Sequence, residues 1–532
     1  MINKTKFIFV TGGVLSGLGK GVSAASLGRL LKSRGFKVFV QKFDPYYNVN
    51  PGSLSPFQHG EVFVTHDGAE TDLDLGHYER FIGEKFTKES NYVQGKLLLE
   101  LLEEEKQGKS GGKTIQVVPH VTNKIINKIE MAAQNSKADF IITEIGGTVG
   151  DIESLPFISA ISQFSRKRRN SSFFIHATYV PYLEASNEFK SKPTQNSISQ
   201  LQSMGIFPNM ILLRANKQIP RNVVKKVAEK AYLDSGSCIP VPNSDNIYKV
   251  PLHFEAYGMA DKVLDHFEIK PKQKTNLDDW KKYVNLIDMV KTKTVTIAMI
   301  GKYVEFEEAY KSIVEAVNIS GNWNEVNIKT KWFLADDLTN QNIEERLKGI
   351  DGAIILPGFG KRGFEGKVVA AEFLREKDIP TLGICYGFQA MCVVQAKKKG
   401  IKNATSSEVS ETGSFVIDII KTEESLNGKM RLGESETILT KESVIQKLYK
   451  KTSSFERHRH KYEFNHKYID KIQDNEFKFT GFDKETKLVE VCEMPNKKFY
   501  VGLQAHPEFN ANPLNEHPVF RGLIKTIKEN KA

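Results

Sequence analysis

The sequence has little cysteine and no long apolar run. Only four cysteines, Cys238, Cys385, Cys392 and Cys492, occur in 532 residues, which is too few for a disulfide framework in a chain of this length. No apolar stretch is long enough to span a bilayer, and the run at residues 7–10 is too short for the core of a signal peptide. We therefore expect a cytoplasmic protein in a reducing compartment, with no membrane partner.

A nucleic-acid-binding module is also missing. The net charge is +11, but no basic helix with interleaved aromatic residues accompanies that charge. A lysine-rich solvated surface would explain the excess, and so would several lysine-lined sites for polyanionic nucleotides. We therefore expect no nucleic-acid partner. The hydrophobic content of 40% and charged content of 26% are ordinary for a globular protein, and the length allows two or three domains.

The most informative stretch is a glycine-rich loop at residues 12–21. Residues 7–10 lead into it as a buried strand, and a helical pattern leads out of it. Backbone N–H groups at a helix N-terminus favour an anion, and Lys20 adds a positive charge within reach of a phosphate. The spacing differs from that of the standard P-loop, and Gly21 stands where a Mg²⁺-binding Ser or Thr is usual. A plain tight turn in a parallel α/β fold is the alternative interpretation.

Charged side chains follow at the predicted ends of neighbouring strands. Strand 38–41 runs into Lys42 and Asp44, and ligands gather at the carboxyl ends of strands in an open parallel sheet. A buried strand at 140–144 ends in Glu144, a Walker-B-like position for Mg²⁺. The non-periodic stretch 48–81 supplies three more hard oxygen ligands, which an exposed acidic loop would also explain: Glu70, Asp72 and Asp74.

The pattern of strands and helices predicts an α/β protein with two doubly wound parallel-sheet domains. The first, at 1–269, has the phosphate loop and a helix at 93–107, and we also expect a short strand at 117–120. Residues 270–293 are lysine-rich, contain one helical piece around Trp280 and are interpreted as a linker. The second domain, at 294–532, begins with the apolar run 294–300.

A second chemical centre is predicted at Cys385, in the frame Gly-Ile-Cys-Tyr-Gly-Phe-Gln. The cysteine sits on a sharp turn between a strand and a helix, where a helix N-terminus lowers the pKa of a thiol. His506 can act as its base and Glu508 can orient that base, which gives a Cys–His–Glu triad. Backbone N–H groups of the loop 357–360 can form an oxyanion hole. A lone buried cysteine is the alternative, but the complete frame is far more specific.

These residues together resemble the CTP synthase family, glutamine-dependent amidotransferases that convert UTP to CTP. The resemblance covers essentially the whole chain and is most specific in 44–81, in 144–157, in the Lys-Pro-Thr-Gln turn at 192–195, and in the triad. It implies an N-terminal synthetase domain and a C-terminal class I glutaminase domain. The implied reaction is ATP-dependent amination of UTP, with ammonia passed from the glutaminase site to the synthetase site.

The resemblance also implies ligands for individual residues. ATP would be bound by Ser16, Gly17, Leu18, Gly19, Lys20, Gly21 and Asp74, and Mg²⁺ by Asp74 and Glu144. UTP, or CTP as an inhibitor, would contact Ser16, Asp151, Ile152, Glu153, Lys190, Ser191, Lys192, Pro193, Thr194, Gln195 and Lys226. Glutamine would contact Gly358, Phe359, Gln389, Glu408 and Lys461. GTP as an allosteric activator and a homotetramer are further implications.

Several positions depart from the family pattern. Pro357 stands where the family usually has a second glycine, Lys461 where an arginine is usual, and Ser110 and Gly111 where a Tyr-Leu pair is usual in a loop tied to GTP activation. Two other functions remain open. A related P-loop ligase, of the dethiobiotin-synthetase or cobyrinate-amidase kind, is opposed by the stretch 44–81. A nucleotide-driven assembly protein without catalysis is opposed by the complete triad.

Overall fold

A computed structural model describes residues 4–419 and 430–531. The chain divides into two compact units, of which the first contains residues 1–54 and 74–284 and the second residues 55–73 and 285–532. A short segment from the N-terminal part of the sequence therefore belongs to the second unit. No helix in the described part of the chain combines the length and apolar character needed to cross a membrane.

The first unit is built on a seven-stranded sheet in the order β11-β10-β7-β1-β6-β2-β5, in which all neighbours are parallel. Its strands are β1 (Lys6–Gly12), β2 (Val38–Asp44), β5 (Asn91–Val93), β6 (Phe140–Ile145), β7 (Ser172–Tyr179), β10 (Met210–Ala215) and β11 (Cys238–Pro242). The inner strands are continuous buried runs because helices cover both faces of the sheet. A small hairpin, β8 (Tyr182–Leu183) and β9 (Glu188–Phe189), lies outside it.

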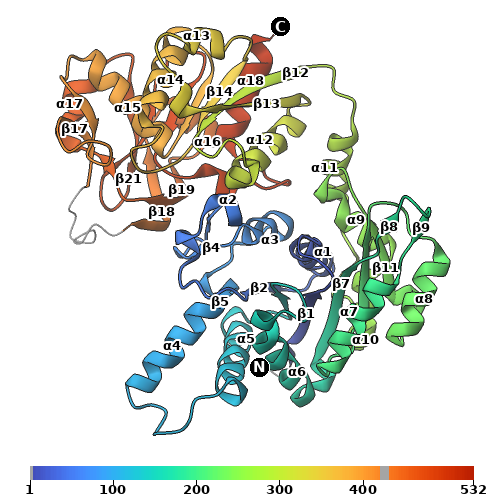
Figure 1. Cartoon of the computed structure of the whole chain (residues 1–532). Coiled ribbons are helices and arrows are strands. Elements are labelled where there is room, and N and C mark those ends of the chain that lie inside the picture. Colours follow the sequence, from blue (N-terminus) through green and yellow to red (C-terminus); the bar gives the residue numbers. More distant parts are fainter. Residues whose placement is uncertain (1–3, 420–429, 532) are drawn as a thin grey trace. The chain divides into compact units, whose positions relative to one another are not determined.

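Helices pack on both faces of this sheet, as the sequence predicted. On one face α1 contacts α3 and α9, and on the other α5 contacts α6 (Figure 1). The helices of this unit are α1 (Lys20–Ser33), α3 (Asp74–Ile82), α4 (Gln94–Lys106), α5 (Thr122–Ser136), α6 (Leu155–Lys167), α7 (Lys192–Ser203), α8 (Arg221–Ala231), α9 (Val250–Ala256) and α10 (Met259–His266). The helix α11 (Asp278–Asp288) includes the helical piece predicted around Trp280.

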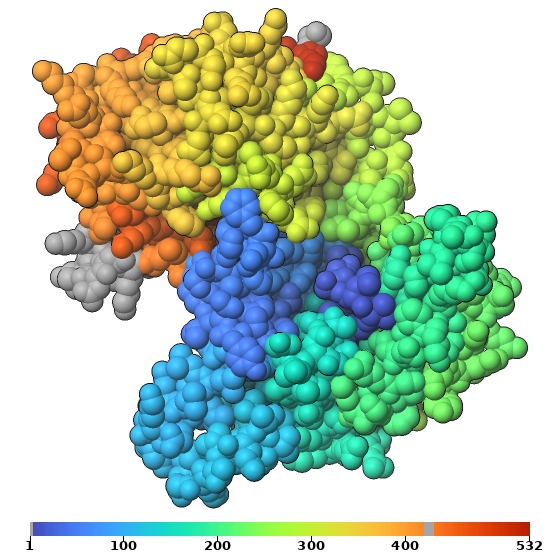
Figure 2. Space-filling view, viewed as in Figure 1, coloured from blue at the N-terminus to red at the C-terminus, as the bar shows by residue number. Residues whose placement is uncertain are grey.

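The helix predicted at 93–107 is confirmed as α4, but the short strand predicted at 117–120 is wrong. Residues Val117–Val121 belong to none of the sheets of the described structure; Val118 is extended, with φ −108° and ψ 123°, and the chain then turns directly into α5. Val117 and Val118 are about half exposed, so this apolar run is not a buried strand. Pro119 also lacks the N–H that a sheet ladder needs. Figure 2 shows the light-blue residues of α4 and the turn after it, which project from the rest of the first unit.

The second unit has a nine-stranded mixed sheet in the order β13-β12-β14-β15-β23-β22-β21-β18-β19. The five strands from β13 to β23 are parallel, which fits the predicted α/β class, and the other four extend the sheet in antiparallel fashion. The strands are β12 (Thr294–Gly301), β13 (Asn327–Leu334), β14 (Gly352–Ile355), β15 (Thr381–Ile384), β18 (Arg431–Leu439), β19 (Ser453–His460), β21 (Lys478–Asp483), β22 (Val489–Glu493) and β23 (Tyr500–Leu503).

Two apolar cores, one on each face of this sheet, hold the second unit together. Strand β12 sends Ala298 and Ile300 into one core and Ile297 and Met299 into the other, as the two-residue period of a strand requires. The helices are α12 (Lys311–Trp323), α13 (Ile343–Arg346), α14 (Phe364–Glu376), α15 (Tyr386–Lys398), α16 (Val444–Tyr449), α17 (Ile469–Ile472) and α18 (Pro518–Asn530). A small sheet contains β16 (Ala404–Ser406), β17 (Ser414–Asp418) and β20 (Glu463–Phe464).

Candidate active sites

The predicted phosphate loop lies between β1 and α1 in the first unit. Gly17 and Gly19 have φ angles of 71° and 74°, a left-handed conformation that favours glycine. A Cβ atom on Gly13 would lie 1.8 Å from the Ser197 hydroxyl oxygen of α7, so the loop lies directly on that helix. Gly19 caps α1 without a side-chain hydrogen bond. The N–H groups of the first turn of α1 are therefore available to an anion.

Two lysines and three carboxylates gather beside this loop. Lys20 is buried and its Nζ donates to the carbonyl of Gly147 at 2.8 Å. Lys42, at the end of β2, donates to the Asp74 carboxylate and lies 3.4 Å from Asp44. Burial lowers the pKa of Lys20, although the carboxylates oppose that shift. The structure thus brings together Lys20, Lys42, Asp74 and Glu144, as the sequence predicted.

Asp74 and Glu144 converge on the first turn of α1. A Cβ atom on Gly21 would lie 2.5 Å from Oδ1 of Asp74 and 3.3 Å from Oε2 of Glu144, so a Ser or Thr would not fit at this position. Glu144 accepts a hydrogen bond from Tyr78, and burial together with the nearby Asp74 raises its pKa to about 7. Burial opposes ionisation of Asp74 as well, but Lys42 outweighs it and lowers the pKa of that carboxyl.

The two carboxylates supply the anionic oxygens that Mg²⁺ prefers and therefore fit a divalent cation. Within 4–419 and 430–531 no group of three or more His, Cys, Asp or Glu side chains is arranged around a common point. Phosphate oxygens and water would have to complete the coordination of a cation here, which is usual for Mg²⁺ bound together with a nucleotide.

Apart from Ser16 in the phosphate loop, the residues predicted to bind UTP or CTP lie on the turn 146–154, on the segment 190–195 that leads into α7, and on α8. A Cβ atom on Gly150 would lie 2.0 Å from Nε2 of Gln200, so this turn and the phosphate loop both pack on α7. Asp151, Ile152 and Glu153 are exposed. These contacts place both the turn and the phosphate loop against α7, at Gln200 and Ser197.

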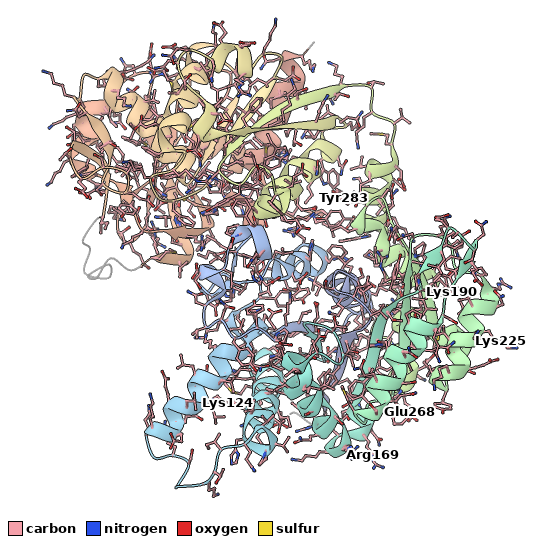
Figure 3. The ribbon with its side chains drawn as sticks, in the orientation of Figure 1. Lys124, Arg169, Lys190, Lys225, Glu268 and Tyr283 are labelled. Carbon is pink, nitrogen blue, oxygen red and sulfur yellow. The ribbon has the colours of Figure 1, made fainter. Side chains whose placement is uncertain are left out.

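The predicted turn 190–195 divides into exposed and buried residues. Lys192 and Pro193 begin α7 and Lys192 is exposed, whereas Thr194 is buried and donates to the carbonyl of Tyr179 at 2.8 Å. Ser191 is buried and accepts from Gln195 at 3.0 Å. Lys190 pairs with Glu188, whose pKa is lowered by that pair and by Lys226 of α8. Figure 3 labels Lys190 and Lys225, the neighbour of Lys226.

In the second unit Cys385 occupies a strained turn between β15 and α15. Its φ of 51° lies in the left-handed region, and its N–H donates to the carbonyl of Leu503 on β23 at 2.7 Å. A Cβ atom on Gly387 would lie 2.2 Å from the carbonyl oxygen of Ile355, so only glycine lets α15 approach β14 so closely. The turn therefore holds the cysteine at a helix N-terminus, as the sequence predicted.

His506 and Glu508 form the predicted pair beside this cysteine. Nδ1 of His506 lies 2.7 Å from Oε1 of Glu508, and both side chains are buried. Burial alone would lower the pKa of His506, but Glu508 and Cys385 outweigh it and raise that pKa to about 10. Nε2 of His506 has no hydrogen-bond partner of good geometry in the described part of the chain. This nitrogen is thus left for a reacting group near the thiol.

A pocket in the second unit joins the triad to the segment 55–73. Gly358 and Phe359 line it together with the triad, and so do Glu61 and Arg459. The segment consists of α2 (Pro56–His59), β3 (Phe63–Val64) and β4 (Glu70–Thr71). Its carboxylates hold it in place, because Glu61 accepts from the Ser312 N–H at 3.0 Å and Glu70 pairs with Arg459 at 2.8 Å.

Sequence analysis assigned no role to Glu61 or Arg459. The signal for both was present, since Arg459 lies beside Lys461 and Glu61 lies in the unusually specific stretch 44–81. Three predicted glutamine-binding residues are not among those that line the pocket. Gln389 donates to the Tyr462 carbonyl at 3.0 Å, Glu408 accepts from the Gly360 N–H at 2.5 Å, and Lys461 is exposed.

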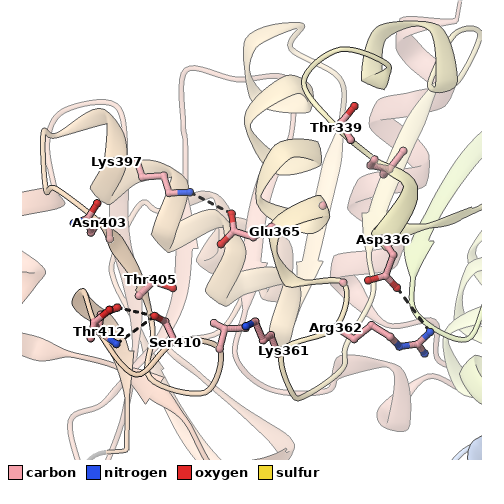
Figure 4. A pocket seen from close by; sticks show the side chains of 15 residues that line it. Asp336, Thr339, Lys361, Arg362, Glu365, Lys397, Asn403, Thr405, Ser410 and Thr412 are labelled. Atoms are coloured by element: carbon pink, nitrogen blue, oxygen red, sulfur yellow. Dashed lines mark hydrogen bonds and ion pairs between the residues drawn. The ribbon is translucent and has the colours of Figure 1, made fainter.

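A second pocket of this unit is lined by residues that include Asp336, Arg362, Glu365 and Lys397 (Figure 4). Four of its charged side chains form ion pairs with one another. Arg362 lies 3.8 Å from Asp336, and Lys397 lies 3.5 Å from Glu365. No residue predicted to bind a ligand lines this pocket.

Comparison with known proteins matches both halves of the chain. The family model described as CTP synthase N-terminus matches residues 6–269, and the model described as glutamine amidotransferase class-I matches residues 306–526. The CTP synthase of Mycoplasmopsis pulmonis is 50% identical, with 99% of this chain and 98% of that protein aligned. The CTP synthase of Bacillus subtilis is 44% identical over 98% of each chain. A solved glutaminase domain of Trypanosoma brucei CTPS with bound acivicin is 27% identical, with a TM-score of 0.42 over 44% of this chain and 94% of that one. The chain therefore belongs to the CTP synthase family.

Proposed function

We propose that this chain converts UTP to CTP with ATP, and that it takes the ammonia from glutamine hydrolysed at Cys385. The observation that carries this proposal is the presence of two chemically different centres in one chain of this family. One is a cluster of lysines and carboxylates beside a glycine loop in the first unit. The other is the cysteine with His506 and Glu508 in the second.

In the synthetase centre we assign ATP to Ser16, Gly17, Leu18, Gly19, Gly21 and Asp74, with Lys20 on its phosphates. Asp74 and Glu144 would hold Mg²⁺, which when bound would neutralise charge on the phosphates. UTP, or CTP as an inhibitor, is assigned to Ser16, to the turn 151–153, to 190–195 and to Lys226. The burial of Lys20 and the convergence of both carboxylates on Gly21 support these assignments.

The reaction in this centre needs positioned charge rather than a covalent nucleophile. The C4 carbonyl of uracil is a poor electrophile, and transfer of a phosphoryl group to its oxygen turns that oxygen into part of a leaving group. Ammonia then attacks C4 and phosphate departs. Lys20 and Lys42 would stabilise charge on the transferring phosphoryl group, which is the main contribution a protein makes to such a step.

In the glutaminase centre the Cys385 thiolate would attack the side-chain amide carbon of glutamine. The imidazolium of His506 would give its proton to the departing ammonia and Glu508 would keep the ring oriented. Water would then hydrolyse the thioester. We assign glutamine to Gly358, Phe359, Gln389, Glu408 and Lys461, of which the first two line the pocket of Cys385.

Three further parts of the proposal rest on the family alone. They are activation by GTP, assembly into a homotetramer and a cytoplasmic location. The turn that contains Ser110 and Gly111 is exposed at the end of α4, so it is accessible to a ligand. Titration of the glutamine-dependent reaction with GTP, together with the mass of the enzyme in solution with and without nucleotides, tests the first two.

The experiment that tests the main proposal is Cys385→Ala, assayed with UTP, ATP and Mg²⁺ and with either glutamine or ammonium. We expect glutamine-dependent CTP formation to fall by about 10⁴-fold or more, because the nucleophile is lost. Ammonia-dependent formation should stay within about twofold of wild type. Cys392→Ala, at a buried cysteine of α15 that lies outside the turn, is the matched control. Retained glutamine-dependent synthesis in Cys385→Ala would contradict the proposal.

A further inference from the structure

The loop 357–360 lies beside Cys385. Three side chains donate hydrogen bonds to backbone carbonyl oxygens of this loop and of the residue before it. Nζ of Lys367, on α14, donates to the carbonyl oxygens of Leu356 at 2.6 Å and Pro357 at 3.2 Å. Lys302, after β12, donates to the carbonyl of Phe359. The hydroxyl of Tyr386, the residue after the nucleophile, donates to the carbonyl of Gly360 at 2.5 Å.

The same three side chains surround Gly358. A Cβ atom on Gly358 would lie 3.2 Å from Nζ of Lys367 and 3.4 Å from both Cδ of Lys302 and Cδ1 of Tyr386. All three side chains are buried, and Lys367 is fully so. A fully buried ammonium is costly. Packing alone therefore does not explain why the Lys367 ammonium is buried against the backbone of this loop.

The planarity of the peptide bond supplies that explanation. In a trans peptide the C=O and N–H groups point in opposite directions, so a donor that holds the carbonyl also fixes the direction of the N–H. The peptide between Phe359 and Gly360 shows this geometry, since its carbonyl accepts from Lys302 while its N–H donates to Glu408 at 2.5 Å.

The peptide between Pro357 and Gly358, two peptide bonds earlier, is held in the same way by Lys367. Its N–H belongs to Gly358, which lines the pocket of Cys385. Across the part of the chain that the structure describes, this N–H is paired with no acceptor. It is therefore a donor without an acceptor of its own, pointed away from Lys367 and beside the nucleophile.

We propose that Lys367, assisted by Lys302 and Tyr386, is a positioning residue of the glutaminase reaction that orients the Gly358 N–H toward the oxyanion. The proposal rests on the proposed function, in which Cys385 attacks the amide carbon of glutamine. When the sulfur–carbon bond forms, the carbonyl π bond breaks and its electron pair goes to the oxygen. A preorganised N–H stabilises that oxygen more in the transition state than in the substrate.

The charges near Lys367 and the protonated hydroxyl of Tyr386 agree with this role. Burial, together with the nearby Lys302, lowers the pKa of Lys367 to about 7, although Cys385, Asp336 and Glu408 oppose the shift. Burial raises the pKa of Tyr386, with Glu408 acting in the same direction, so its hydroxyl remains a donor. The ammonium of Lys367 also lies 4.9 Å from the centre of the Tyr386 ring, where the aromatic face stabilises it.

The test compares two reagents at Cys385. An aldehyde analogue of glutamine, with a formyl group in place of the carboxamide, adds the thiol reversibly, and its oxygen takes the electron pair and then a proton. Iodoacetamide alkylates the same sulfur by displacing iodide and develops no oxyanion. A residue that orients an oxyanion donor affects the first reagent and not the second, whereas a merely structural residue affects both alike.

We expect Lys367→Met to lower the glutaminase kcat by about 10- to 100-fold, somewhat less than the loss of an oxyanion donor itself. KM should change by less than about threefold, and the affinity for the aldehyde should fall in parallel with kcat. The alkylation rate, the ammonia-dependent synthesis and the thermal melting point should stay close to those of wild type. Lys377→Met, at the exposed C-terminal end of the same helix, is the matched control and should change none of these.

Tyr386→Phe removes one hydroxyl and little volume, and we expect a loss of about three- to tenfold in kcat and in aldehyde affinity. If Lys367→Met does not fold, the result for Tyr386→Phe tests the positioning role instead. Parallel losses for the aldehyde and iodoacetamide, or an unchanged kcat in a folded Lys367→Met enzyme, would overturn the positioning role. Cys385→Ala separates this result from the proposed function, because only retention of glutamine-dependent synthesis in that variant counts against the function itself.

Discussion

The two reaction centres use charge in different ways. In the first unit the two cations Lys20 and Lys42 face the three carboxylates of Asp44, Asp74 and Glu144, so the centre is built from opposed charges. In the second unit a cysteine in a left-handed conformation stands beside a histidine whose pKa is raised to about 10. The difference follows from the chemistry, because phosphoryl transfer depends on positioned charge and amide hydrolysis depends on an activated nucleophile.

The centres also differ in how the chain assembles them. The residues of the synthetase centre come from the carboxyl ends of neighbouring parallel strands and from the helices that follow them, a common location for ligand sites. The glutaminase pocket instead gathers the segment 55–73, the loop 357–360, Arg459, and the turns of Cys385 and His506. A site of the second kind depends on more long-range contacts, so its positioning residues are harder to identify in advance.

The largest effect that would test this contrast is expected for Lys20→Ala. Removal of the buried cation should lower CTP formation by about 10³-fold, with ammonia and with glutamine alike, because the charge acts on the phosphoryl group. Hydrolysis of glutamine by the second unit should persist when a nucleotide is bound. Steady-state rates with both nitrogen sources measure this, and Lys32→Ala, at a partly exposed position of the same helix, is the control. Near-normal ammonia-dependent synthesis would refute the role of Lys20.

The next effect concerns the two carboxylates that converge on Gly21. Asp74→Asn and Glu144→Gln each remove one anionic oxygen ligand. We expect the Mg²⁺ concentration that gives half-maximal synthesis to rise by about tenfold or more in each variant. A Mg²⁺ titration of ammonia-dependent synthesis measures the shift, and Glu130→Gln, at a residue paired with Arg168, is the control. An unchanged Mg²⁺ requirement in both variants would mean that the cation is held elsewhere.

A smaller effect is expected at the start of α7. Lys192 is exposed at the first position of that helix, on which the phosphate loop and the turn 146–154 both pack. Lys192→Ala should raise the KM for UTP by about tenfold or relieve inhibition by CTP, since a charge directed at a phosphate is lost. Lys225→Ala, at an exposed lysine of α8, should leave both values unchanged. If Lys192→Ala also leaves them unchanged, the turn does not belong to the nucleotide site.

The sequence predicted the parts of the molecule in which a local pattern determines the structure. The buried runs around Ile8, Ile142 and Ile354 indicated parallel strands, and the glycines around Cys385 indicated the strained turn. It could not predict the antiparallel strands β18, β19, β21 and β22, because charged and polar residues interrupt their apolar residues and leave no continuous apolar run. Nor could it place residues 117–121, where a short apolar run lies on the surface.

In the candidate sites too, residues with a local sequence signal were predicted and residues placed only by tertiary contacts were not. Glu144 ends a predicted strand and Cys385 follows one, Lys20 lies in a glycine-rich loop and His506 belongs to a His-Pro-Glu sequence, so each of them had a local signal. The role of Lys367 in holding the loop 357–360 left no local signal, since a lysine in the helix α14 is ordinary in sequence and its burial is a tertiary property. The assignment of residues 55–73 to the second unit likewise depends on contacts such as Glu61 with Ser312, which are far apart in the sequence.

The smallest effect concerns an acidic cluster of the second unit, in which three carboxylates share a single arginine, whereas the carboxylates of the first centre face two lysines. Arg431 is the cation shared by Glu463, Asp483 and Glu490. Burial raises the pKa of Glu463 to about 8, and Glu490 adds to the shift.

A carboxyl whose pKa is about 4.3 when unfolded and higher when folded stabilises the protein below that lower value, and this contribution is lost as pH rises toward 8. The glutamine side chain in Glu463→Gln cannot ionise, so this variant does not lose that stability as pH rises. Relative to wild type, its free energy of unfolding should therefore rise by about 2–3 kcal/mol between pH 6 and pH 9, or by about 4–12 °C in the melting point of the glutaminase transition. Thermal melts of both proteins at the two pH values measure this difference.

Glu436→Gln, whose carboxylate pairs with the exposed Lys484, should not produce the same rise. A constant difference between Glu463→Gln and wild type from pH 6 to pH 9 would mean that Glu463 is already ionised in the folded protein, and that Arg431 alone balances all three carboxylates.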